Sequence, residues 1–417
     1  MMLRKAMLEI GAVALTHLLQ FPAPTEDQLI IPCPCGQQAR FVELRSKGFL
    51  SILGQTEVLR PYYLCQHCHT GRSPIDRALD IEKKELSPGV RRLQSFAGHA
   101  DPFDQGRRQL KILAGIEVTT KSVERSAEEI GADIAARAQI KIQQVVQLKL
   151  PVIAGKKQPL LYIEMDGTGV SVVKKETVGR QGKTDGKPSH TREVKLGCVF
   201  TQTKPDAEGR PMRDPDSTTF VSAIETADEF GLRIYREALD RGWDRTEKKV
   251  VLGDGAVWIW NIAEQHFTGA IQIVDLFHAC QHLWDLARKL HPNDEAKQKQ
   301  WVDIHKDLLD RGKPKKLYVA LCDIADKHPI DAVAESFRTE AAYFRRNALR
   351  MRYPKFRRQH LFVGSGVIEA GCKTVIGKRL KQSGMFWTVS GANAIIALRC
   401  CYLNGEFEDY WEDRRAA

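Results

Sequence analysis

Apolar positions change their spacing along this chain. From Pro159 onward they gather in short runs bounded by glycine or polar residues, which is typical of buried strands. The stretch from 219 to 241, and that from His278 to about Arg352, have helical spacing instead. Three strands followed by helix, strand, helix and strand indicate a mixed sheet in an α/β layer. The predicted strands are 160–167, 169–174, 194–202, 250–255 and 270–275.

The chain before Pro159 is predicted to hold three smaller parts. Residues 1–21 are apolar at helical spacing, but Glu9 and His17 interrupt them, which favours an amphipathic helix over a signal peptide. Turn-rich residues at 21–24 and 155–159 enclose a cysteine-bearing segment and a helical segment. No run approaches the roughly 18 apolar residues of a membrane span, so we expect a cytoplasmic protein without a membrane partner.

Two helices joined by a short turn are predicted around Gly115. Residues 101–115 suit the first helix, with Phe103, Leu110 and Leu113 at helical spacing. The second begins near Thr119 and gathers its apolar positions on one face, namely Val123, Ala127, Ile130 and Ile134. Lys121, Ser122 and Arg125 would then face outward, where a recognition helix meets base edges. Helices that merely pack give the same pattern, so both interpretations stay open.

Four of the ten cysteines form two close pairs, Cys33 with Cys35 and Cys65 with Cys68. Such pairs on two tight turns are typical of a zinc ribbon, in which four thiolates surround one ion. The single residue between Cys33 and Cys35 is shorter than the usual spacing, so His67 or His69 remains an alternative ligand. Four unbonded core cysteines are the competing interpretation. We predict one structural Zn²⁺.

The sequence is basic, with 63 Lys and Arg against 52 Asp and Glu and a net charge of +11, which favours a polyanionic partner. Most of the excess lies between Arg338 and Lys381, where twelve basic residues accompany two acids. Aromatic residues interleave with them and could stack on unpaired bases; they are Tyr343, Phe344, Tyr353 and Phe356. A solvated helix face is the alternative. We predict DNA contacts at Arg345, Arg346, Arg350, Arg352, Lys355, Arg357, Arg358, Lys378, Arg379 and Lys381.

Asp166 and Asp254 each follow an apolar run and precede glycine. Either alone would be ordinary turn chemistry, because Asp-Gly is a favoured turn pair. Together they suit a ribonuclease H-like sheet, whose first and fourth strands are parallel neighbours. Glu369, early in a helix among lysines and arginines, is the predicted third acid. Glu164 is its rival, since residues two apart on a strand share a face.

Clustered carboxylates repel one another unless cations neutralise them, and oxygen ligands suit Mg²⁺ or Mn²⁺. We predict two such ions held by Asp166, Asp254 and Glu369. Two ions about 3.5 to 4 Å apart activate the attacking oxygen and stabilise the leaving one during displacement at phosphorus. Asp275 and His278, which follow another strand, are auxiliary candidates. Helix capping by Asp275 is the plainer interpretation.

These motifs together resemble the bacterial DDE transposases of the Kra type of insertion sequences, distant relatives of the Mutator-like group. The resemblance implies that Asp166, Asp254 and Glu369 are the catalytic triad. It also implies that Asp275 and His278 match the Asp-x-x-His motif of Mutator-like enzymes. It rests on DGTG (166–169), REVKLGCVFTQT (192–203), VLGDGAVWIWNIA (251–263), IVDLFHA (273–279), GSGVIEAGCK (364–373) and RLKQSGMFW (379–387).

The expected architecture is α/β, a ribonuclease H-like catalytic core with an all-helical insertion, preceded by a zinc ribbon and a helix-turn-helix-like segment. The expected function is cleavage and joining of DNA at the inverted-repeat ends of a mobile element, by a homo-oligomer associated with the bacterial nucleoid. Two alternatives are a sugar-kinase-like ATPase and an inactive or domesticated DNA-binding protein. The expected segments are the N-terminal helix (1–30), the zinc ribbon (31–82), the helical DNA-binding segment (83–150), the first part of the core (151–279), the helical insertion (280–361) and the end of the core (362–417).

Overall fold

The computed structural model describes residues 2–147, 158–182 and 189–416, and the chain divides into two compact units. The small unit comprises Met1–Gly131 and Trp411–Ala417, and the large unit comprises Ala132–Tyr410. Residues 155–157 of the predicted boundary lie outside the described residues. Across the described part of the chain, no helix combines the length and apolar character needed to cross a membrane.

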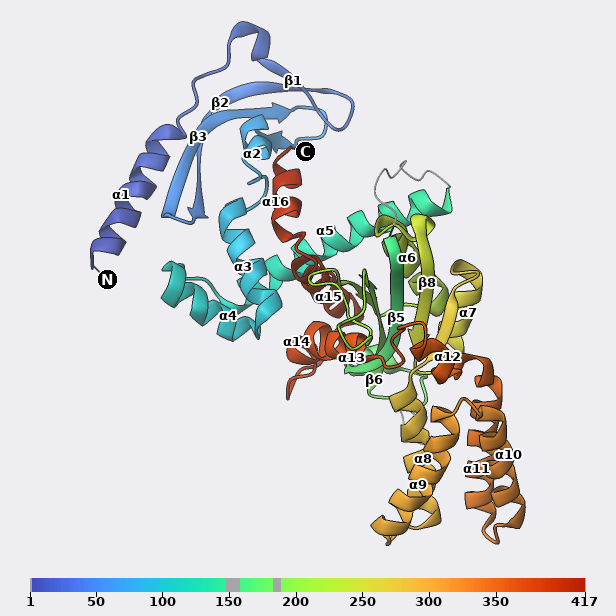
Figure 1. Ribbon diagram of the computed structural model, residues 1–417. Helices are drawn as coiled ribbons and strands as arrows, with labels where there is room; N and C mark the ends of the chain where they lie inside the picture. Colours follow the sequence, from blue (N-terminus) through green and yellow to red (C-terminus); the bar gives the residue numbers. More distant parts are fainter. Residues whose placement is uncertain (1, 148–157, 183–188, 417) are drawn as a thin grey trace. The chain divides into compact units, whose positions relative to one another are not determined.

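A four-stranded antiparallel sheet organises the small unit, in the order β1-β2-β3-β4 (Figure 1). Its two long strands form a hairpin that closes at the pair Ser51 and Gly54. The predicted N-terminal helix is confirmed as α1 (Met2–Leu18), which packs beside β3. The strands are β1 (Ile30–Pro32), β2 (Gln38–Ser51), β3 (Gly54–Cys65) and β4 (Gly71–Arg72).

The two helices predicted around Gly115 are confirmed as α4 (Phe103–Gln109), extended by a π-helical turn η2 (Leu110–Ala114), and α5 (Thr120–Val146). Gly115 separates them in the left-handed conformation, at φ 71°. Two positions of the predicted pattern are wrong. Leu113 is exposed, because the wider π-helical turn shifts it off the buried face. Ser122 is half-buried and accepts a hydrogen bond from Gln94.

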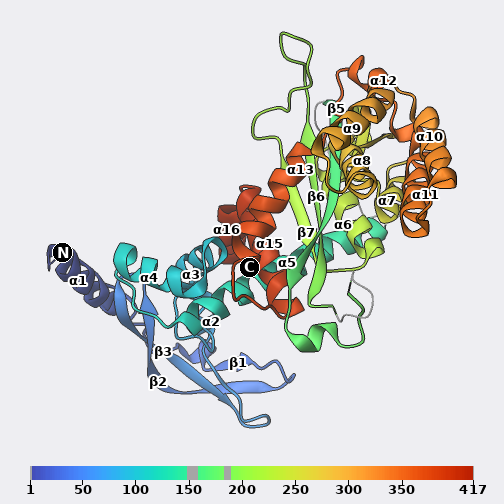
Figure 2. The ribbon, with the colours of Figure 1, turned by 90° about the horizontal axis from the view of Figure 1, so that it is seen from below.

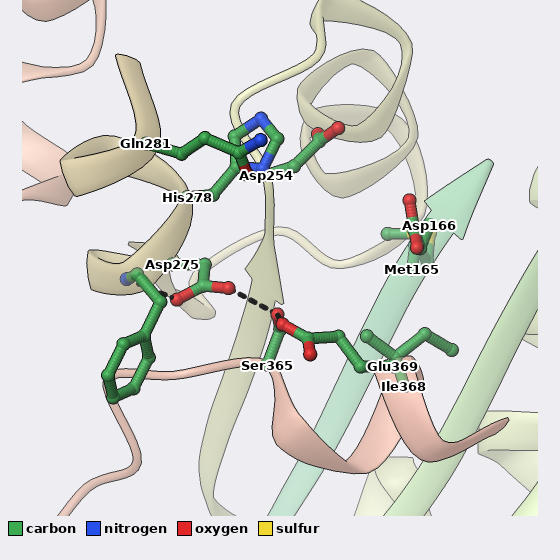
Figure 3. A pocket seen from close by; sticks show the side chains of 10 residues that line it. Met165, Asp166, Asp254, Asp275, His278, Gln281, Ser365, Ile368 and Glu369 are labelled. Atoms are coloured by element: carbon green, nitrogen blue, oxygen red, sulfur yellow. Dashed lines mark hydrogen bonds between the residues drawn. The ribbon is translucent and has the colours of Figure 1, made fainter. Parts of the chain in front are cut away.

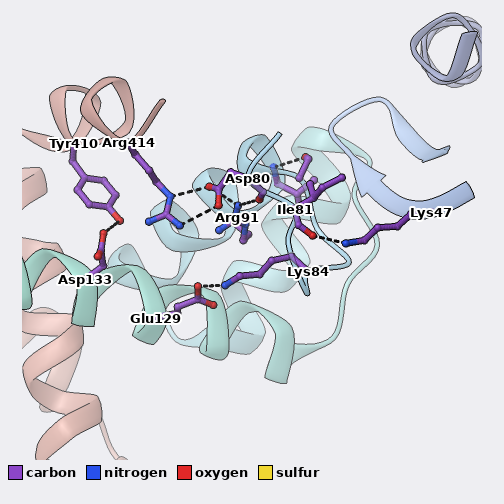
Figure 4. Close-up of polar contacts among 11 residues, drawn as sticks. Lys47, Asp80, Ile81, Lys84, Arg91, Glu129, Asp133, Tyr410 and Arg414 are labelled. Atoms are coloured by element: carbon purple, nitrogen blue, oxygen red, sulfur yellow. Dashed lines mark hydrogen bonds and ion pairs between the residues drawn. The ribbon is translucent and has the colours of Figure 1, made fainter. Parts of the chain in front are cut away.

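Ion pairs hold the remaining helices of the small unit, α2 (Pro74–Ala78) and α3 (Pro88–Ala100). In α2, Asp76 accepts from Arg60 of β3 at 2.8 Å. Figure 4 shows Arg91 of α3 and Arg414 of α16 (Phe407–Ala416) both reaching Asp80. Burial alone would raise the pKa of Asp80, but hydrogen bonds from Arg414 and Arg91 hold it below its ordinary value.

A five-stranded mixed sheet, in the order β7-β6-β5-β8-β9, forms the centre of the large unit. The central strand β5 is antiparallel to β6 and parallel to β8. The edge strand β7 is antiparallel to β6, and β9 is parallel to β8. The strands are β5 (Gln158–Ser171), β6 (Thr191–Thr201), β7 (Thr219–Ala223), β8 (Thr246–Gly253) and β9 (Ile271–Val274).

Two sequence predictions about this sheet are wrong. The predicted strands 160–167 and 169–174 belong to the single strand β5, because Gly167 and Gly169 do not turn and remain paired with Lys195 and Glu193 of β6. The predicted helix 219–241 begins instead as strand β7, and helix α6 (Ala227–Asp240) starts only after a capping box at Thr226.

Helices pack on both faces of this sheet (Figure 2). On one face a Cβ at Gly197 would meet Ile234 of α6, and Ile259 of α7 (Val257–His266) lies close to Gly253. The other face receives α13 (Gly366–Gly371), whose Gly371 lies against Leu196 and Phe220. Asp166 is paired with Leu196 across the β5–β6 ladder and therefore points to the α13 face.

The stretch after β9 is helical, as predicted (Figure 1). Its aromatic residues Tyr343, Phe344, Tyr353 and Phe356 are all buried, so the prediction that they stack on bases is wrong. Helical spacing turns these rings into the core and leaves the neighbouring arginines outside. The helices are α8 (Leu276–Leu290), α9 (Glu295–Asp310), α10 (Pro314–Lys327), α11 (Asp331–Arg346) and α12 (Tyr353–Arg357); after α13 follow the π-helical η6 (Cys372–Gly377), α14 (Lys378–Leu380) and α15 (Val389–Leu403).

Candidate active site

Strand register brings three aspartates to one edge of the sheet. Met165 of β5 is the parallel partner of Gly253 of β8, and Gly253 is the partner of Val274 of β9. Asp166, Asp254 and Asp275 are the next residues on these three neighbouring strands. Asp254 and Asp275 lie just beyond the carboxyl ends of β8 and β9, where ligands bind in open α/β sheets, and Asp166 lies at the same level inside the longer strand β5.

An open pocket of about 120 Å³ lies at this edge. Figure 3 shows its carboxylates arriving from different elements: Asp166 from β5, Asp254 from the turn after β8 and Glu369 from α13. Asp275 and His278 line the same pocket from the start of α8. The structure therefore gathers the three acids and the two auxiliary residues that the sequence singled out, although they span more than 200 residues of the chain.

Asp166 is half-buried and has both carboxylate oxygens engaged. Its Oδ1 accepts from the backbone N–H of Gly167 at 2.6 Å, and its Oδ2 lies 3.3 Å from the Cys372 thiol, which donates to it. Burial raises the pKa of Asp166, and the nearby Asp254 carboxylate raises it further. Cys372, which follows Glu369 by three residues, was not predicted to take part in the site.

Asp254 is held by its own turn and by a helix of the later chain. Its Oδ1 accepts from the N–H of Ala256 at 2.8 Å, and its backbone carbonyl accepts from the Tyr343 hydroxyl of α11 at 2.8 Å. Gly255 has φ +100°, and a Cβ there would come within 2.6 Å of the Tyr343 ring. Only glycine suits this turn, because it combines positive φ with close contact to a buried ring.

Ser365 links Asp275 to Glu369. Asp275 is 2% exposed; its Oδ1 caps α8 by accepting from the Phe277 N–H at 2.7 Å, and its Oδ2 accepts from the Ser365 hydroxyl. The Ser365 oxygen also lies 3.4 Å from Glu369 Oε1. Glu369 itself is exposed. Asp275 therefore has the capping role expected of it on plain chemistry, whereas Glu369 presents its carboxylate to the pocket.

Glu164, the rival third acid, is fully buried and does not line the pocket. Its Oε2 accepts from the backbone N–H of Ile368 at 2.9 Å. Burial raises its pKa to about 8, and the Asp275 and Glu369 carboxylates add to the effect. Of the two rival acids, only Glu369 lines the pocket, whereas Glu164 is buried beneath it with one oxygen engaged by Ile368.

His278 belongs to a group of rings on α8 and α11. It contacts His282 at a centroid distance of 5.0 Å, and His282 stacks on Tyr343 at 4.2 Å. The Nδ1 of His282 lies 2.7 Å from Glu340 Oε2. His278 thus lines the pocket, while His282 ties α8 to α11 through Glu340 and Tyr343.

The donor set of the pocket suits a hard divalent cation. Asp166, Asp254 and Glu369 offer oxygen ligands, and both burial and the nearby Asp254 carboxylate raise the pKa of Asp166, which is a penalty that a bound cation relieves. In the described residues, Asp254 Oδ2 and Glu369 Oε2 accept no hydrogen bond. These acids stand further apart than the cysteines of the small unit, whose sulfurs alone among the described residues gather within 4.8 Å.

Cys33, Cys35, Cys65 and Cys68 converge on one point and could hold a zinc ion. Their sulfurs lie 3.6 Å apart between Cys33 and Cys68 and 3.7 Å apart between Cys35 and Cys65. The short CPCG spacing works because Gly36, at φ 83°, turns the chain directly after Cys35. Hydrogen bonding with Thr70 lowers the pKa of Cys68, whereas burial and contacts with the other three thiols raise that of Cys35, so the four thiols titrate as one interacting group.

The basic residues predicted to contact DNA fall into two groups. Arg379 is fully buried over Trp387, and four others have internal partners: Arg350 binds Gln272 and Glu264, Arg357 pairs with Asp310, Lys121 pairs with Glu124 and Lys381 donates to Thr168. The prediction that Arg379 contacts DNA is wrong, because its side chain is fully buried. The remaining predicted contacts are exposed, namely Arg345, Arg346, Arg352, Lys355, Arg358 and Lys378, as is Arg125 of α5.

Comparisons with known proteins add little to this geometry. No family model matches the chain, and no curated protein matches it. Among solved structures, it is similar to one described as "Drosophila P element transposase strand transfer complex", with a TM-score of 0.26 and 10% sequence identity. That likeness covers 81% of this chain and 84% of the other. A TM-score of this size carries no argument about fold or function.

Proposed function

We propose that this protein is a DDE-type DNA transposase of a bacterial insertion sequence, with Asp166, Asp254 and Glu369 as its catalytic acids. The observation that carries the proposal is the strand register: Asp166 and Asp254 directly follow the paired residues Met165 and Gly253 on adjacent parallel strands, and Glu369 lines the same pocket. Three acids in such a pocket suit phosphoryl transfer better than they suit a merely structural role.

The sheet supports a ribonuclease H-like core. Three antiparallel strands, β5, β6 and β7, are followed by a helix and then by β8 and β9, which add in parallel on the other side of β5. This is the arrangement expected when the first and fourth strands carry paired acids. The helices α9 to α12 then interrupt the core between β9 and the segment that supplies Glu369.

The chain's own residues would position DNA for an in-line displacement. Asp166 and Asp254 face each other across the strand ends, and Glu369 closes the third side of the pocket. Two bound Mg²⁺ or Mn²⁺ ions would activate the attacking oxygen and stabilise the leaving one. A water at the attacking position gives strand cleavage, and a DNA 3′-hydroxyl at the same position gives strand transfer. His278 lines the same pocket and would contact the scissile phosphate.

The exposed arginines around α11 and α12 would supply phosphate contacts. Arg345 and Arg346 are the last residues of α11. Tyr343, near the same end of this helix, donates a hydrogen bond to the Asp254 carbonyl, so the two arginines lie close to the proposed site. Arg352, Lys355 and Arg358 continue this exposed basic set. In the described residues none of these five forms an ion pair with an acid, which leaves their charges for a polyanion.

The test is metal-dependent nicking of duplex DNA that carries the inverted repeats flanking the gene. Asp166→Asn and Asp254→Asn should each abolish nicking in Mg²⁺ and Mn²⁺ while DNA binding persists, because amides keep the shape but lose the charge. Glu247→Gln, an exposed acid on β8, is the matched control and should nick normally. Normal nicking by both Asn variants would rule out the proposed site.

A further inference from the structure

Glu164 is a buried acid that does not line the pocket, so the proposed metal site does not explain it. It lies two residues before Asp166 on β5, is 0% exposed, and one of its oxygens, Oε1, has no hydrogen-bond partner in the described structure. Burying a carboxyl group is costly unless a specific contact requires it. The contact it makes is the 2.9 Å hydrogen bond that its Oε2 accepts from the N–H of Ile368.

That contact satisfies the start of helix α13. Ser365 stands at the N-cap of α13, but its side chain makes no capping hydrogen bond and donates instead to Asp275. The first N–H groups of a helix have no partner within the helix and need an acceptor from elsewhere. The Ile368 N–H is the third of these groups, and Glu164 supplies the acceptor from the strand beneath.

We propose that Glu164 is a positioning residue that fixes α13, and with it Glu369, at the level of Asp166. The inference rests on the proposed function, in which Glu369 is a catalytic acid. Ile368 directly precedes Glu369, and Glu164 and Asp166 share one face of β5. Glu164 therefore links the strand of the first acid to the helix of the third.

A second contact shows that α13 needs such a link. In the described residues, no capping bond comes from Ser365, and the helix is only six residues long before it passes into the π-helical turn η6. Short helices have little stability of their own. The Cys372 thiol, just beyond α13, holds Asp166 from the other end of the same segment. Glu164 and Cys372 thus clamp the segment to β5 on either side of Glu369.

The experiment compares Glu164→Met with Glu164→Gln in the full-length protein. Methionine has a similar shape but no acceptor for Ile368, whereas glutamine keeps a carbonyl oxygen. Glu164→Met should fold with a melting temperature near that of the wild type, because the gain from removing a buried carboxyl group offsets the cost of leaving the Ile368 N–H without its acceptor. Its nicking rate should nevertheless fall about 10- to 100-fold, the scale of a small misplacement of a catalytic group. Glu164→Gln should restore nicking to within a few-fold of wild type.

Hydrogen exchange of the α13 backbone gives a readout that does not depend on activity. Exchange at Ile368 should be faster in Glu164→Met than in wild type and near normal in Glu164→Gln. If wild-type protein does not nick DNA but Ile368 exchange responds in this way, the proposed function fails while the positioning contact stands. If Glu164→Met nicks normally with unchanged exchange, Glu164 does not position α13.

Two further outcomes are decisive. If Glu164→Gln is as inactive as a variant of Asp166, Glu164 is a ligand or acid in its own right, and the positioning role is overturned. If Glu164→Met does not fold, Glu164→Leu replaces it, with the same expected loss of nicking and the same exchange measurement. Slow exchange at Ile368 in both apolar variants would contradict the inference.

Discussion

Gly255→Ala tests how the turn after β8 holds Asp254. Gly255 has φ +100°, and an added Cβ would lie 2.6 Å from Cε2 and 2.8 Å from the hydroxyl oxygen of Tyr343. The ring cannot move aside easily, because it is buried, stacks on His282 at 4.2 Å and contacts Phe344. The substitution therefore combines backbone strain with steric overlap.

Gly269→Ala is the matched control, since Gly269 has φ +81° and nothing within 4 Å of its added Cβ. Backbone strain alone should cost the control about 1 to 2 kcal/mol in the free energy of unfolding. Overlap in a packed site adds about 1 to 3 kcal/mol, so Gly255→Ala should cost about 2 to 5 kcal/mol. Urea denaturation measures both values.

Activity should separate the two variants further. Gly255→Ala moves the backbone that carries Asp254 and should abolish nicking, whereas Gly269→Ala should nick normally at temperatures where it is folded. In a Tyr343→Ala background, Gly255→Ala should cost only the strain part, because the overlapping ring is gone, and the double-mutant cycle then isolates the overlap. Equal unfolding costs for the two alanine variants, with normal nicking by both, would refute the contact between Gly255, Asp254 and Tyr343.

Two other predictions concern the metal of the small unit and the DNA surface. Protein purified without chelator should contain about one zinc per chain. Cys68→Ser should lower both the zinc content and the stability of the protein, because the buried core around Cys33, Ala39, Tyr63 and Cys65 is small. Zinc-free protein with a normal melting temperature would refute the site. Changing Arg345, Arg346 and Arg352 together to Gln should flatten the dependence of log affinity on log salt by up to about 0.9 for each lost phosphate contact, and an unchanged slope would place the DNA elsewhere.

The parts of the site that follow from strand patterns were predictable from the sequence. Asp254 directly follows the apolar run of β8, so its place at the sheet edge follows from the run itself, whereas Asp166 lies inside β5, which continues to Ser171. The spacing of the two cysteine pairs likewise predicts that their four sulfurs meet at one point. The length of β5 was not predictable, because Gly167 and Gly169 favour turns locally and only their pairing with β6 keeps them extended.

Contacts between segments that are distant in the sequence could not be predicted from it. Tyr343 was predicted to stack on unpaired bases, but its ring is buried and its hydroxyl donates to the Asp254 carbonyl, 89 residues away in the sequence. The burial of Arg379 and the cap from Glu164 to Ile368 depend in the same way on tertiary packing. A serine four residues before Glu369 in GSGVIE was the one local signal that a helix start, and hence a cap, lay beside the third acid.

The central claim is that Glu369 completes a catalytic set with Asp166 and Asp254, and nicking by folded Glu369→Gln tests it most directly. As a mere helix residue Glu369 would lose at most about 1 kcal/mol of stability as glutamine, and activity would survive. As a metal ligand it loses its charge at nearly constant shape. We predict that Glu369→Gln folds and binds inverted-repeat DNA but does not nick it in Mg²⁺ or Mn²⁺, while Glu164→Gln does. Normal nicking by Glu369→Gln, with Glu164→Gln inactive, would contradict this assignment.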